Sequence, residues 1–298
     1  MKIWLITDKR NAKAYGAKRI IEEAKKNNIV IKKVLIEDIE LVIDSHMQED
    51  FYVKNKKMKL PDLVIPRVCV SYNMKSIMEY LENKSVAVIN SNTARFLAKD
   101  KFLSLQKLAI ESIPVPKTVL LKWKPNTSFI EETLGFPVII KKIEWAQWKG
   151  IIKANTKEDF EDIIEMLEDT SSIDSKNFIL QEFIGEKAGQ DIRLFVVGGR
   201  VVWSMLRKGK QWDFKSNFSW GGSVNNHIPN EKEEMLAIQA ANIIGLDIAG
   251  IDLLFDKNNG YKICEVNASP GFEWLEEATN QNIAEEIVNY IKIRYLEN

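Results

Sequence analysis

Three oxygen-bearing side chains near the end of the chain have a spacing that suits a divalent metal ion. Asp252 lies in one run of strand-forming residues, and Glu265 and Asn267 lie in the next. The residues between these runs are rich in Asp, Asn and Gly, which is typical of a β-hairpin. If the hairpin is symmetric about Asn258 and Asn259, Asp252 lies opposite Glu265, and all three side chains share one face.

The chemistry expected of this face is metal binding. Two carboxylates that face each other repel, and a hard cation relieves the repulsion. Mg²⁺ takes a few protein oxygens and completes its shell with phosphate and water, so Mg²⁺ is the predicted ion and Mn²⁺ the alternative. A solvated acidic face has the same spacing, and a slip of one residue would separate the carboxylates. The alternate side chains, including Cys264, are expected to point into a core.

Basic residues earlier in the chain provide a second set of candidates. Lys141 ends an apolar run, and Lys101 follows Asp100 on a helical stretch. In a nucleotide enzyme such lysines bind phosphate oxygens as point charges, although each alone is typical of a surface lysine. Arg193 and Arg207 can clamp a phosphate or a carboxylate with two hydrogen bonds. An exposed ion pair at a strand end explains Arg193 equally well.

Composition sets the limits within which these residues must be positioned. The 298 residues suffice for about two domains, and 45% of them are hydrophobic. Lys plus Arg equal Asp plus Glu at 42 each, so no global field attracts nucleic acid or an anionic membrane. No run reaches the roughly 20 apolar residues of a membrane span. Cys69 and Cys264 are predicted to be buried free thiols, in a protein of the reducing cytoplasm.

Apolar periodicity predicts the elements that carry the candidate residues. In the first ninety residues, strands are expected at 3–6, 30–35, 63–66 and 86–89, with helices at 15–25 and 74–81. This alternation predicts a small parallel α/β domain. Beyond it we expect helices at 93–110, 157–168, 231–244 and 282–294 and strands at 117–122, 136–141, 178–183, 192–197, 200–206, 250–255 and 261–266.

The motifs resemble those of the RimK-type ATP-grasp ligases, carboxylate–amine ligases that include the ribosomal-protein glutamate ligases. The resemblance is carried by Asp100-Lys101, Val138-Ile-Ile-Lys141, Gln181-Glu-Phe-Ile184, Asp191-Ile-Arg193, Phe214-Lys-Ser-Asn217, Gly221-Gly-Ser223, Ala249-Gly-Ile-Asp252 and Glu265-Val-Asn-Ala-Ser-Pro-Gly271. It implies an α/β fold with a small N-terminal parallel domain, at residues 1–90, before a two-lobed ATP-grasp domain. The central lobe would take residues 91–180 and the C-terminal lobe residues 181–298.

The resemblance also implies roles for individual residues. Lys101 and Lys141 would bind the ATP phosphates, and Asp191 would hold the ribose. Asp252, Glu265 and Asn267 would carry two Mg²⁺ ions. The catalytic residues around the transferred phosphoryl group would be Arg193, Arg207 and Asn217. Adenine would contact Glu182, Phe183 and Ile184, with Gln181 and Lys215 as further nucleotide-binding residues.

The activity implied is amide formation through an acyl phosphate, on an amino acid or a peptide or protein terminus, with release of ADP and phosphate. A homo-oligomer is expected from the family alone. One segment departs from the family, because Trp145 and Trp148 stand where a glycine- and serine-rich loop usually covers the triphosphate. Two alternatives therefore stay open: a kinase or synthetase with another nucleophile, and a nucleotide-binding module without turnover.

Overall fold

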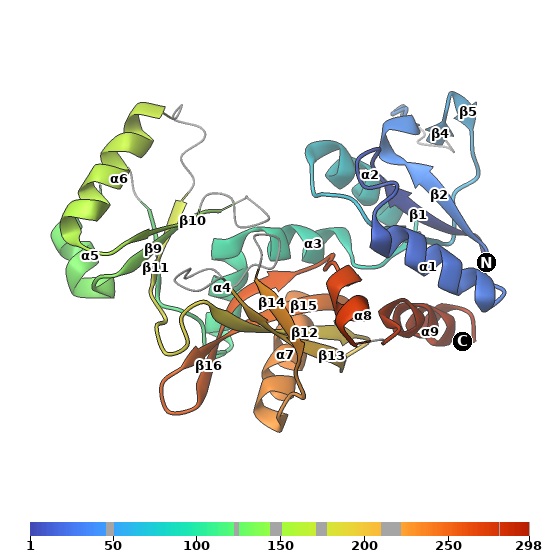
Figure 1. Cartoon of the computed structure of the whole chain (residues 1–298). Helices are drawn as coiled ribbons and strands as arrows, with labels where there is room; N and C mark the ends of the chain where they lie inside the picture. Colours follow the sequence, from blue (N-terminus) through green and yellow to red (C-terminus); the bar gives the residue numbers. More distant parts are fainter. Residues whose placement is uncertain are drawn as a thin grey trace.

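The computed structural model describes residues 1–45, 51–121, 125–143, 151–170, 178–209, 222–279 and 281–297. These residues form an N-terminal domain, a central lobe and a C-terminal lobe (Figure 1). The loop at 144–150, which contains Trp145 and Trp148, lies outside the described residues, as do Lys215 and Asn217. No helix in the described ranges is long and apolar enough to span a bilayer.

The N-terminal domain is built on a parallel sheet, as predicted. Its strand order is β2 (Ile31–Leu35), β1 (Ile3–Thr7), β6 (Leu63–Pro66) and β7 (Ala87–Val88). Helices α1 (Tyr15–Lys26) and α2 (Tyr72–Asn83) connect these strands. All of β1 is buried because its alternate residues enter two different cores, with Ile3 and Leu5 in one and Trp4 and Ile6 in the other. A small antiparallel sheet, β3 (Ile39–Leu41), β4 (Phe51–Val53) and β5 (Lys56–Lys57), adjoins it.

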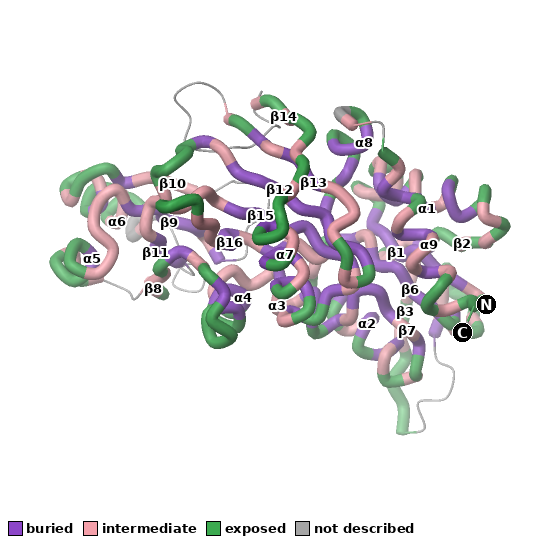
Figure 2. The backbone as a smooth tube through the Cα atoms, turned by 90° about the horizontal axis from the view of Figure 1, so that it is seen from below, coloured by how far each residue is buried: buried purple, intermediate pink, exposed green. Residues whose placement is uncertain are grey.

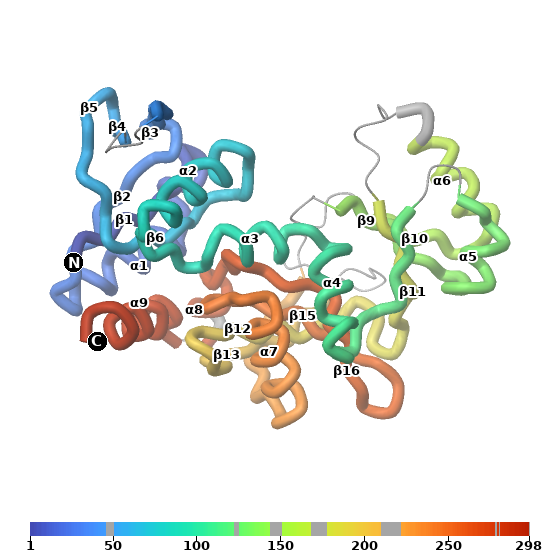
Figure 3. The backbone as a smooth tube through the Cα atoms, turned by 180° about the vertical axis from the view of Figure 1, so that it is seen from behind, coloured from blue at the N-terminus to red at the C-terminus, as the bar shows by residue number. Residues whose placement is uncertain are grey.

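The central lobe is an antiparallel sheet with two helices on it. The strand order is β10 (Ile151–Ala154), β9 (Val138–Lys142), β11 (Phe178–Glu182) and β8 (Thr118–Leu120). Helices α5 (Thr127–Leu134) and α6 (Lys157–Thr170) contribute Ile130 and Phe160 to a core that draws only on this lobe. The lobe therefore stands apart from the rest of the molecule (Figure 3).

The C-terminal lobe supplies the largest sheet. Its order is β14 (Ser223–Asn226), β13 (Arg200–Lys208), β12 (Gln190–Val197), β15 (Ile248–Asp256) and β16 (Gly260–Asn267), all antiparallel. Helix α7 (Glu231–Ile244) covers one face, where Ile192, Leu194, Ile251 and Leu253 are buried. In Figure 2 the central strands β12 and β15 are mostly buried, whereas the edge strand β14 is largely exposed. Arg193 and Asp252 alternate with these core residues along β12 and β15, so they belong to the opposite face.

The N-terminal domain and the C-terminal lobe share a core. Helix α9 (Ile283–Tyr295) packs on α1, and both contribute to one cluster that also contains Phe195 and Phe272. The Asn90 amide donates to the carbonyl oxygens of Ile248 and Ala268, both at 2.7 Å, and its own oxygen accepts from the Ile248 amide. These two parts therefore form one body, to which the central lobe is attached.

Three expectations from the sequence need correction. The helix expected at 93–110 is two helices, α3 (Asn92–Lys99) and α4 (Lys101–Ile110), because the Asp100 carboxylate accepts from the amides of Phe102 and Leu103 and starts a new helix. Cys69 is exposed rather than buried, although both cysteines are free, as predicted. Several short elements were missed: β3, β4, β5, β10, β14, α5 and α8 (Glu273–Thr279).

The boundaries at 90 and 180 stay predictions. The α3–α4 pair, assigned from the sequence to the central lobe, packs on α7 and β16 of the C-terminal lobe instead of on the central sheet. Helix α4 therefore begins beside the hairpin that carries the candidate metal ligands, and Lys101 is its first residue.

Candidate active site

The β15–β16 hairpin places the candidate carboxylates opposite each other, as predicted, but by a different route. Near its tip, Leu253 pairs with Ile263, which centres the turn on Asn258 alone. The register then shifts between Asp252 and Leu253, so that Asp252 pairs with Glu265. Without the β-bulge, a turn centred on Asn258 would pair Asp252 with Cys264. The bulge moves the register by one residue and so pairs Asp252 with Glu265.

The bulge corrects the expected direction of Cys264. Ile263 and Val266 are the residues of β16 that enter the core beside α7. Cys264 instead lines a slot together with Lys141, because the two residues of a bulge that oppose one partner residue do not alternate in the ordinary way. Burial raises the pKa of the Cys264 thiol, and the nearby charge of Lys141 opposes that shift only in part.

Two arginines meet the hairpin from the neighbouring strands. Arg193 on β12 lies opposite Asp252 and donates to both of its carboxylate oxygens at 2.7 Å. Arg207 on β13 lies opposite Asp191, donates to its two oxygens at 2.5 and 2.7 Å, and approaches Asp252 Oδ2 to 2.9 Å. Both arginines therefore share the candidate face.

The ion pairs determine the protonation of this cluster. Burial alone would raise the pKa of Asp252, but Arg193 and then Arg207 more than offset that effect and lower it. Burial would likewise lower the pKa of Arg207, yet Asp191 and Asp252 raise it. Asp252 and Arg207 are consequently charged at neutral pH.

The other two candidate metal ligands lie at the base of the hairpin. Glu265 is partly exposed and its carboxylate lies 3.7 Å from Lys101 Nζ. Asn267 Nδ2 is buried and has no hydrogen-bond partner among the described residues, which is unusual for a native amide. This nitrogen is a donor and suits an acceptor such as a phosphate oxygen, whereas the atom of the amide that can bind a metal ion is Oδ1. Asp252 accepts one hydrogen bond at Oδ1 and two at Oδ2, so Oδ1 keeps a lone pair. The donor set therefore fits a hard cation.

Most of the predicted nucleotide-binding residues line one slot between the central and C-terminal lobes. They are Lys141, Gln181, Glu182, Phe183 and Ile184, and Leu254 and Cys264 of the hairpin form the opposite wall. Burial lowers the pKa of Lys141, the largest effect on that ammonium group. The Glu182 carboxylate is already bonded, to the Lys117 amide at 2.7 Å and to Lys262 Nζ at 2.6 Å. Both of these bonds use Oε1 of Glu182.

Asp191 does not line this slot, whereas its neighbour Gln190 does. Asp191 is completely buried, and both its oxygens accept from Arg207. Its contact with ribose stays a prediction, and the structure places it as the partner of an arginine.

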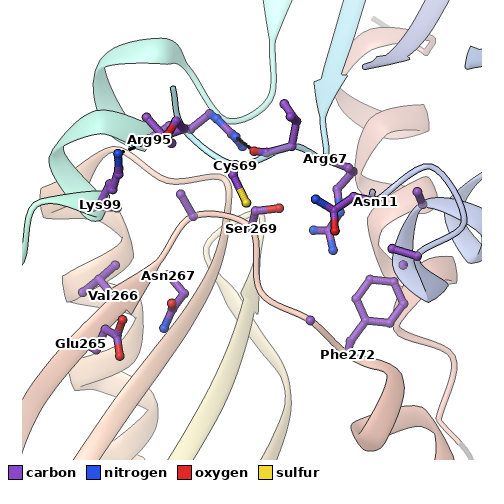
Figure 4. Close-up of a pocket in the computed structure, with 18 of the residues that line it drawn as sticks. Asn11, Arg67, Cys69, Arg95, Lys99, Glu265, Val266, Asn267, Ser269 and Phe272 are labelled. Atoms are coloured by element: carbon purple, nitrogen blue, oxygen red, sulfur yellow. Dashed lines mark hydrogen bonds between the residues drawn. The ribbon is translucent and has the colours of Figure 1, made fainter. Parts of the chain in front are cut away.

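A larger cavity of 640 Å³ adjoins the other side of the hairpin (Figure 4). Glu265, Asn267 and Lys101 line one end of it, and Arg67 and Asn11 of the N-terminal domain line the other. Sequence reasoning did not single out Arg67 as a site residue. Its signal was weak, because the only cue was a Pro-Arg pair at the end of a buried strand.

Comparison with known proteins matches this architecture throughout. The RimK pre-ATP-grasp domain matches residues 1–94, and the RimK-like ATP-grasp domain matches residues 98–291. A probable alpha-L-glutamate ligase of Methanococcoides burtonii is 35% identical over 296 residues, which are 98% of this chain and 95% of that protein. A protein of the same name from Hydrogenovibrio crunogenus is 33% identical over 295 residues, with the same coverage of 98% and 95%.

A solved structure shares the fold at low sequence identity. It is the ATP-grasp ligase PsnB, complexed with a phosphomimetic variant of its minimal precursor, Mg and ADP, and it has a TM-score of 0.74 at 16% identity over 98% of both chains. The two matched domains together span residues 1–94 and 98–291. The chain belongs to the RimK family of ATP-grasp ligases, and its reaction is ATP-dependent amide formation.

Proposed function

We propose that this ligase phosphorylates a carboxylate with ATP bound in the slot and passes the acyl group to an amine in the adjoining cavity. One observation carries the proposal: two adjacent residues of β16 face different compartments. Cys264 lines the slot, and Glu265 lines the cavity. A nucleotide whose base occupies the slot would therefore extend its phosphates past the hairpin to the cavity.

The residues at this junction suit phosphoryl transfer to a carboxylate. Lys141 on the slot side and Lys101 on the cavity side would bind phosphate oxygens as point charges. Arg193 and Arg207 would stabilise the charge that spreads over the transferred phosphoryl oxygens. Their bonds to Asp252 and Asp191 hold both guanidinium groups in place before a substrate arrives. The amine nitrogen then attacks the carbonyl carbon of the acyl phosphate. A C–N bond forms, the C–O bond to the phosphate breaks, and inorganic phosphate leaves with that oxygen.

Mg²⁺ is the proposed metal, with Asp252, Glu265 and Asn267 as its protein ligands. Bound there, it would offset negative charge on the phosphate oxygens. The number of ions, the use of Mn²⁺, the homo-oligomer and the cytoplasmic location stay predictions. Lys215 and Asn217 also stay predictions, because they lie outside the described residues.

The proposed substrates are an amino acid or the terminus of a peptide or protein. Two observations on other proteins support this choice: the relatives are named probable alpha-L-glutamate ligases, and PsnB was solved with a precursor peptide. L-Glutamate is therefore the first amine to test.

The experiment is Mg²⁺-dependent ADP release from ATP across a panel of carboxylates and amines. We expect release that needs both a carboxylate and an amine, and a fall of about 100-fold or more in kcat for Glu265→Gln. Glu111→Gln, at an exposed ion pair with Lys107, is the matched control. ADP release without any amine would favour the kinase alternative. Nucleotide binding without turnover over the whole panel would favour the binding module.

A further inference from the structure

A groove of 460 Å³ runs along the outer edge of the parallel sheet in the N-terminal domain. One side of it is strand β2, from Lys32 to Leu35, and the other is the β4–β5 hairpin, which contributes Val53, Lys54 and Lys56. In Figure 1, β4 and β5 lie on the far side of this domain from α9. We call this feature the lysine groove, and it is separate from the slot and from the cavity beside the β15–β16 hairpin.

Positive charge surrounds the lysine groove. Its lining contains one carboxylate and four exposed lysines, which are Lys32, Lys33, Lys54 and Lys56. The carboxylate is that of Asp38, and its Oδ2 lies 3.6 Å from Lys54 Nζ. Glu37 lies next to Asp38 in the chain, and its carboxylate accepts from the Lys9 amide at 3.0 Å. The groove is therefore locally basic on a chain without net charge, and such a site attracts an acidic partner.

The floor between the lysines is apolar. Val34 is 2% exposed, and Val53 and Met58 pack against the same core cluster. A small anion would pair with the lysines and leave this floor in water. A polypeptide with both acidic and apolar side chains would satisfy the lysines and cover the floor.

Strand β2 also offers backbone groups to a partner. It is the end strand of the order β2, β1, β6 and β7, and within the described part of the chain no strand pairs with its outer edge. An extended polypeptide can add to such an edge through backbone hydrogen bonds. Lysines on the edge repel a second copy of the same strand, so the chain that adds must be acidic. Backbone amides and apolar side chains distinguish this partner from a nucleic acid.

The lysine groove and the cavity share one wall, the loop that follows β1. Ala12 lines the groove, and Asn11, labelled in Figure 4, lines the cavity. Strands β1 and β2 are parallel and Thr7 pairs with Leu35, so both strands end at the side of the sheet where this loop begins. Lys33 Nζ donates to the Ala12 carbonyl oxygen at 3.3 Å, which ties the groove to the loop. A polypeptide that crosses this loop would therefore reach both sites.

We infer that the lysine groove is a docking site for an acidic, extended segment of a polypeptide substrate whose terminus reacts in the cavity. The inference rests on the proposed function, because it takes the terminus of a peptide or protein as the substrate. An extended chain advances roughly 3.3 Å per residue, so about four residues would follow the groove along β2. Docking at this distance adds binding energy without any contact to the reacting groups. A free amino acid is too short to use it.

Docking can be measured without turnover. The probe is a fluorescein-labelled peptide in which Glu and Val alternate, titrated with the full chain and followed by fluorescence anisotropy. We expect saturable binding that weakens as NaCl is raised, because salt screens exposed charges. The same peptide with Lys in place of Glu should not bind.

Charge reversal decides whether the groove is responsible. Lys33→Glu combined with Lys56→Glu should raise the Kd of the Glu–Val peptide by about 10-fold or more. Lys25→Glu combined with Lys257→Glu is the matched control, because it makes the same change in net charge at two exposed lysines outside the groove. Lys25 is on α1, which packs on the other face of the sheet, and Lys257 is in the turn between β15 and β16.

A milder variant separates charge from folding. Lys33→Gln combined with Lys56→Gln removes the two charges without reversing them, so it should weaken binding less than the Glu variant. Circular dichroism shows whether each variant keeps the wild-type fold.

Three results would overturn the inference. Equal binding of the Glu–Val and Lys–Val peptides, or an unchanged Kd in the Lys33→Glu, Lys56→Glu variant, would show that the groove does not recognise acidic polypeptide. Tighter binding of labelled duplex DNA or of phosphatidylcholine–phosphatidylserine vesicles, lost in the same variant, would assign the groove to another polyanion.

The binding assay contains no nucleotide, so its outcome is independent of the ligase reaction. Neither Lys33 nor Lys56 lines the slot or the cavity, so their variant should retain ADP release with the small carboxylate and amine that the panel identifies. ADP release by an enzyme that does not bind the Glu–Val peptide would reject the docking site alone. Peptide binding that is lost in the variant, in an enzyme silent over the whole panel, would keep the docking site and reject the proposed function.

Discussion

Arg207 donates to both Asp191 and Asp252, so one guanidinium group joins two carboxylates that are fully buried. Arg193 completes the cluster from the next position on the same face of the sheet. Two arginines and two aspartates thus alternate across three adjacent strands, and their charges cancel. The cluster explains how a charged catalytic face persists on a sheet whose other side is an apolar core.

Replacing Arg207 by Met should remove this compensation and leave two buried carboxylates with one arginine between them. We expect a loss of roughly 3–5 kcal/mol in the free energy of unfolding at neutral pH, measured by denaturant titration. The matched variant Arg207→Lys keeps the charge but not the forked geometry, so its loss should be smaller. Equal stability of wild type and Arg207→Met would show that the cluster carries no such energy.

The same variant has a predicted dependence on pH. The pKa of Asp252 is lowered in the fold, so its contribution to stability is present above the unfolded value of about 3.9 and is lost as pH falls through the folded value. Without Arg207 the buried carboxylates should take up protons at higher pH. The difference in stability between wild type and Arg207→Met should therefore narrow as pH falls, and a constant difference would contradict this account.

Sequence patterns predicted the hairpin and the pairing of Asp252 with Glu265 well, because alternation along a strand is a local property. The predicted pairing of Asp252 with Glu265 was correct, yet the predicted direction of the Cys264 side chain was not. A bulge shifts the alternation of side chains, and no residue type in this segment indicates a bulge. The helices α3 and α4 read as one helix, because apolar spacing continues across Asp100 and only its cap geometry separates them.

Arg67 was the main omission, for a different physical reason. Its place in the cavity wall depends on Gly16, Pro270 and Phe272, which come from distant parts of the chain and meet only in the folded protein. The periodicity of apolar residues carries no information on such long-range tertiary contacts. The parallel N-terminal sheet was predictable, by contrast, because strands alternating with helices leave few other arrangements.

Lys141 should show a conflict between stability and binding. It is a buried cation, and burial lowers its pKa, so Lys141→Met should raise the free energy of unfolding by about 1 kcal/mol at neutral pH. The gain should shrink as pH rises through the lowered folded-state pKa, because wild-type Lys141 then loses its charge. Affinity for ATP, measured by calorimetry, should fall by about 10-fold or more.

The neighbouring lysine provides the control for that trade. Lys142 is the next residue of β9 and is only half-buried. Lys142→Met should therefore change the free energy of unfolding and the ATP affinity by no more than about half of the changes expected for Lys141→Met. If Lys141→Met lowered stability while keeping ATP affinity, Lys141 would be a structural residue rather than a phosphate ligand.

Asn90 should be a strong point of attachment between the N-terminal domain and the C-terminal lobe. It is 2% exposed and forms hydrogen bonds with three backbone groups, two on Ile248 and one on Ala268. Asn90→Ala leaves these groups unsatisfied, so we expect a loss of roughly 3 kcal/mol in the free energy of unfolding, whereas Asn225→Ala on the exposed edge of the sheet should have little effect. Because Ala268 lines the cavity, the KM for the amino acid should also rise. An unchanged KM with lowered stability would limit the role of Asn90 to folding.

Cys264 and Ile263 offer the sharpest test of the bulge. Although they are adjacent on one strand, substitution of Cys264 should affect ADP binding and substitution of Ile263 should affect stability. Cys264→Leu would fill a slot that encloses only 50 Å³, so the affinity for ADP should fall by about 10-fold or more. Cys264→Ala, the size control, should leave ADP binding nearly unchanged. Ile263→Ala creates a cavity beside α7 and should cost about 2–5 kcal/mol of stability with ADP affinity retained. If Cys264→Leu instead destabilised the fold without weakening ADP binding, Cys264 would point into the core, as plain strand alternation predicts.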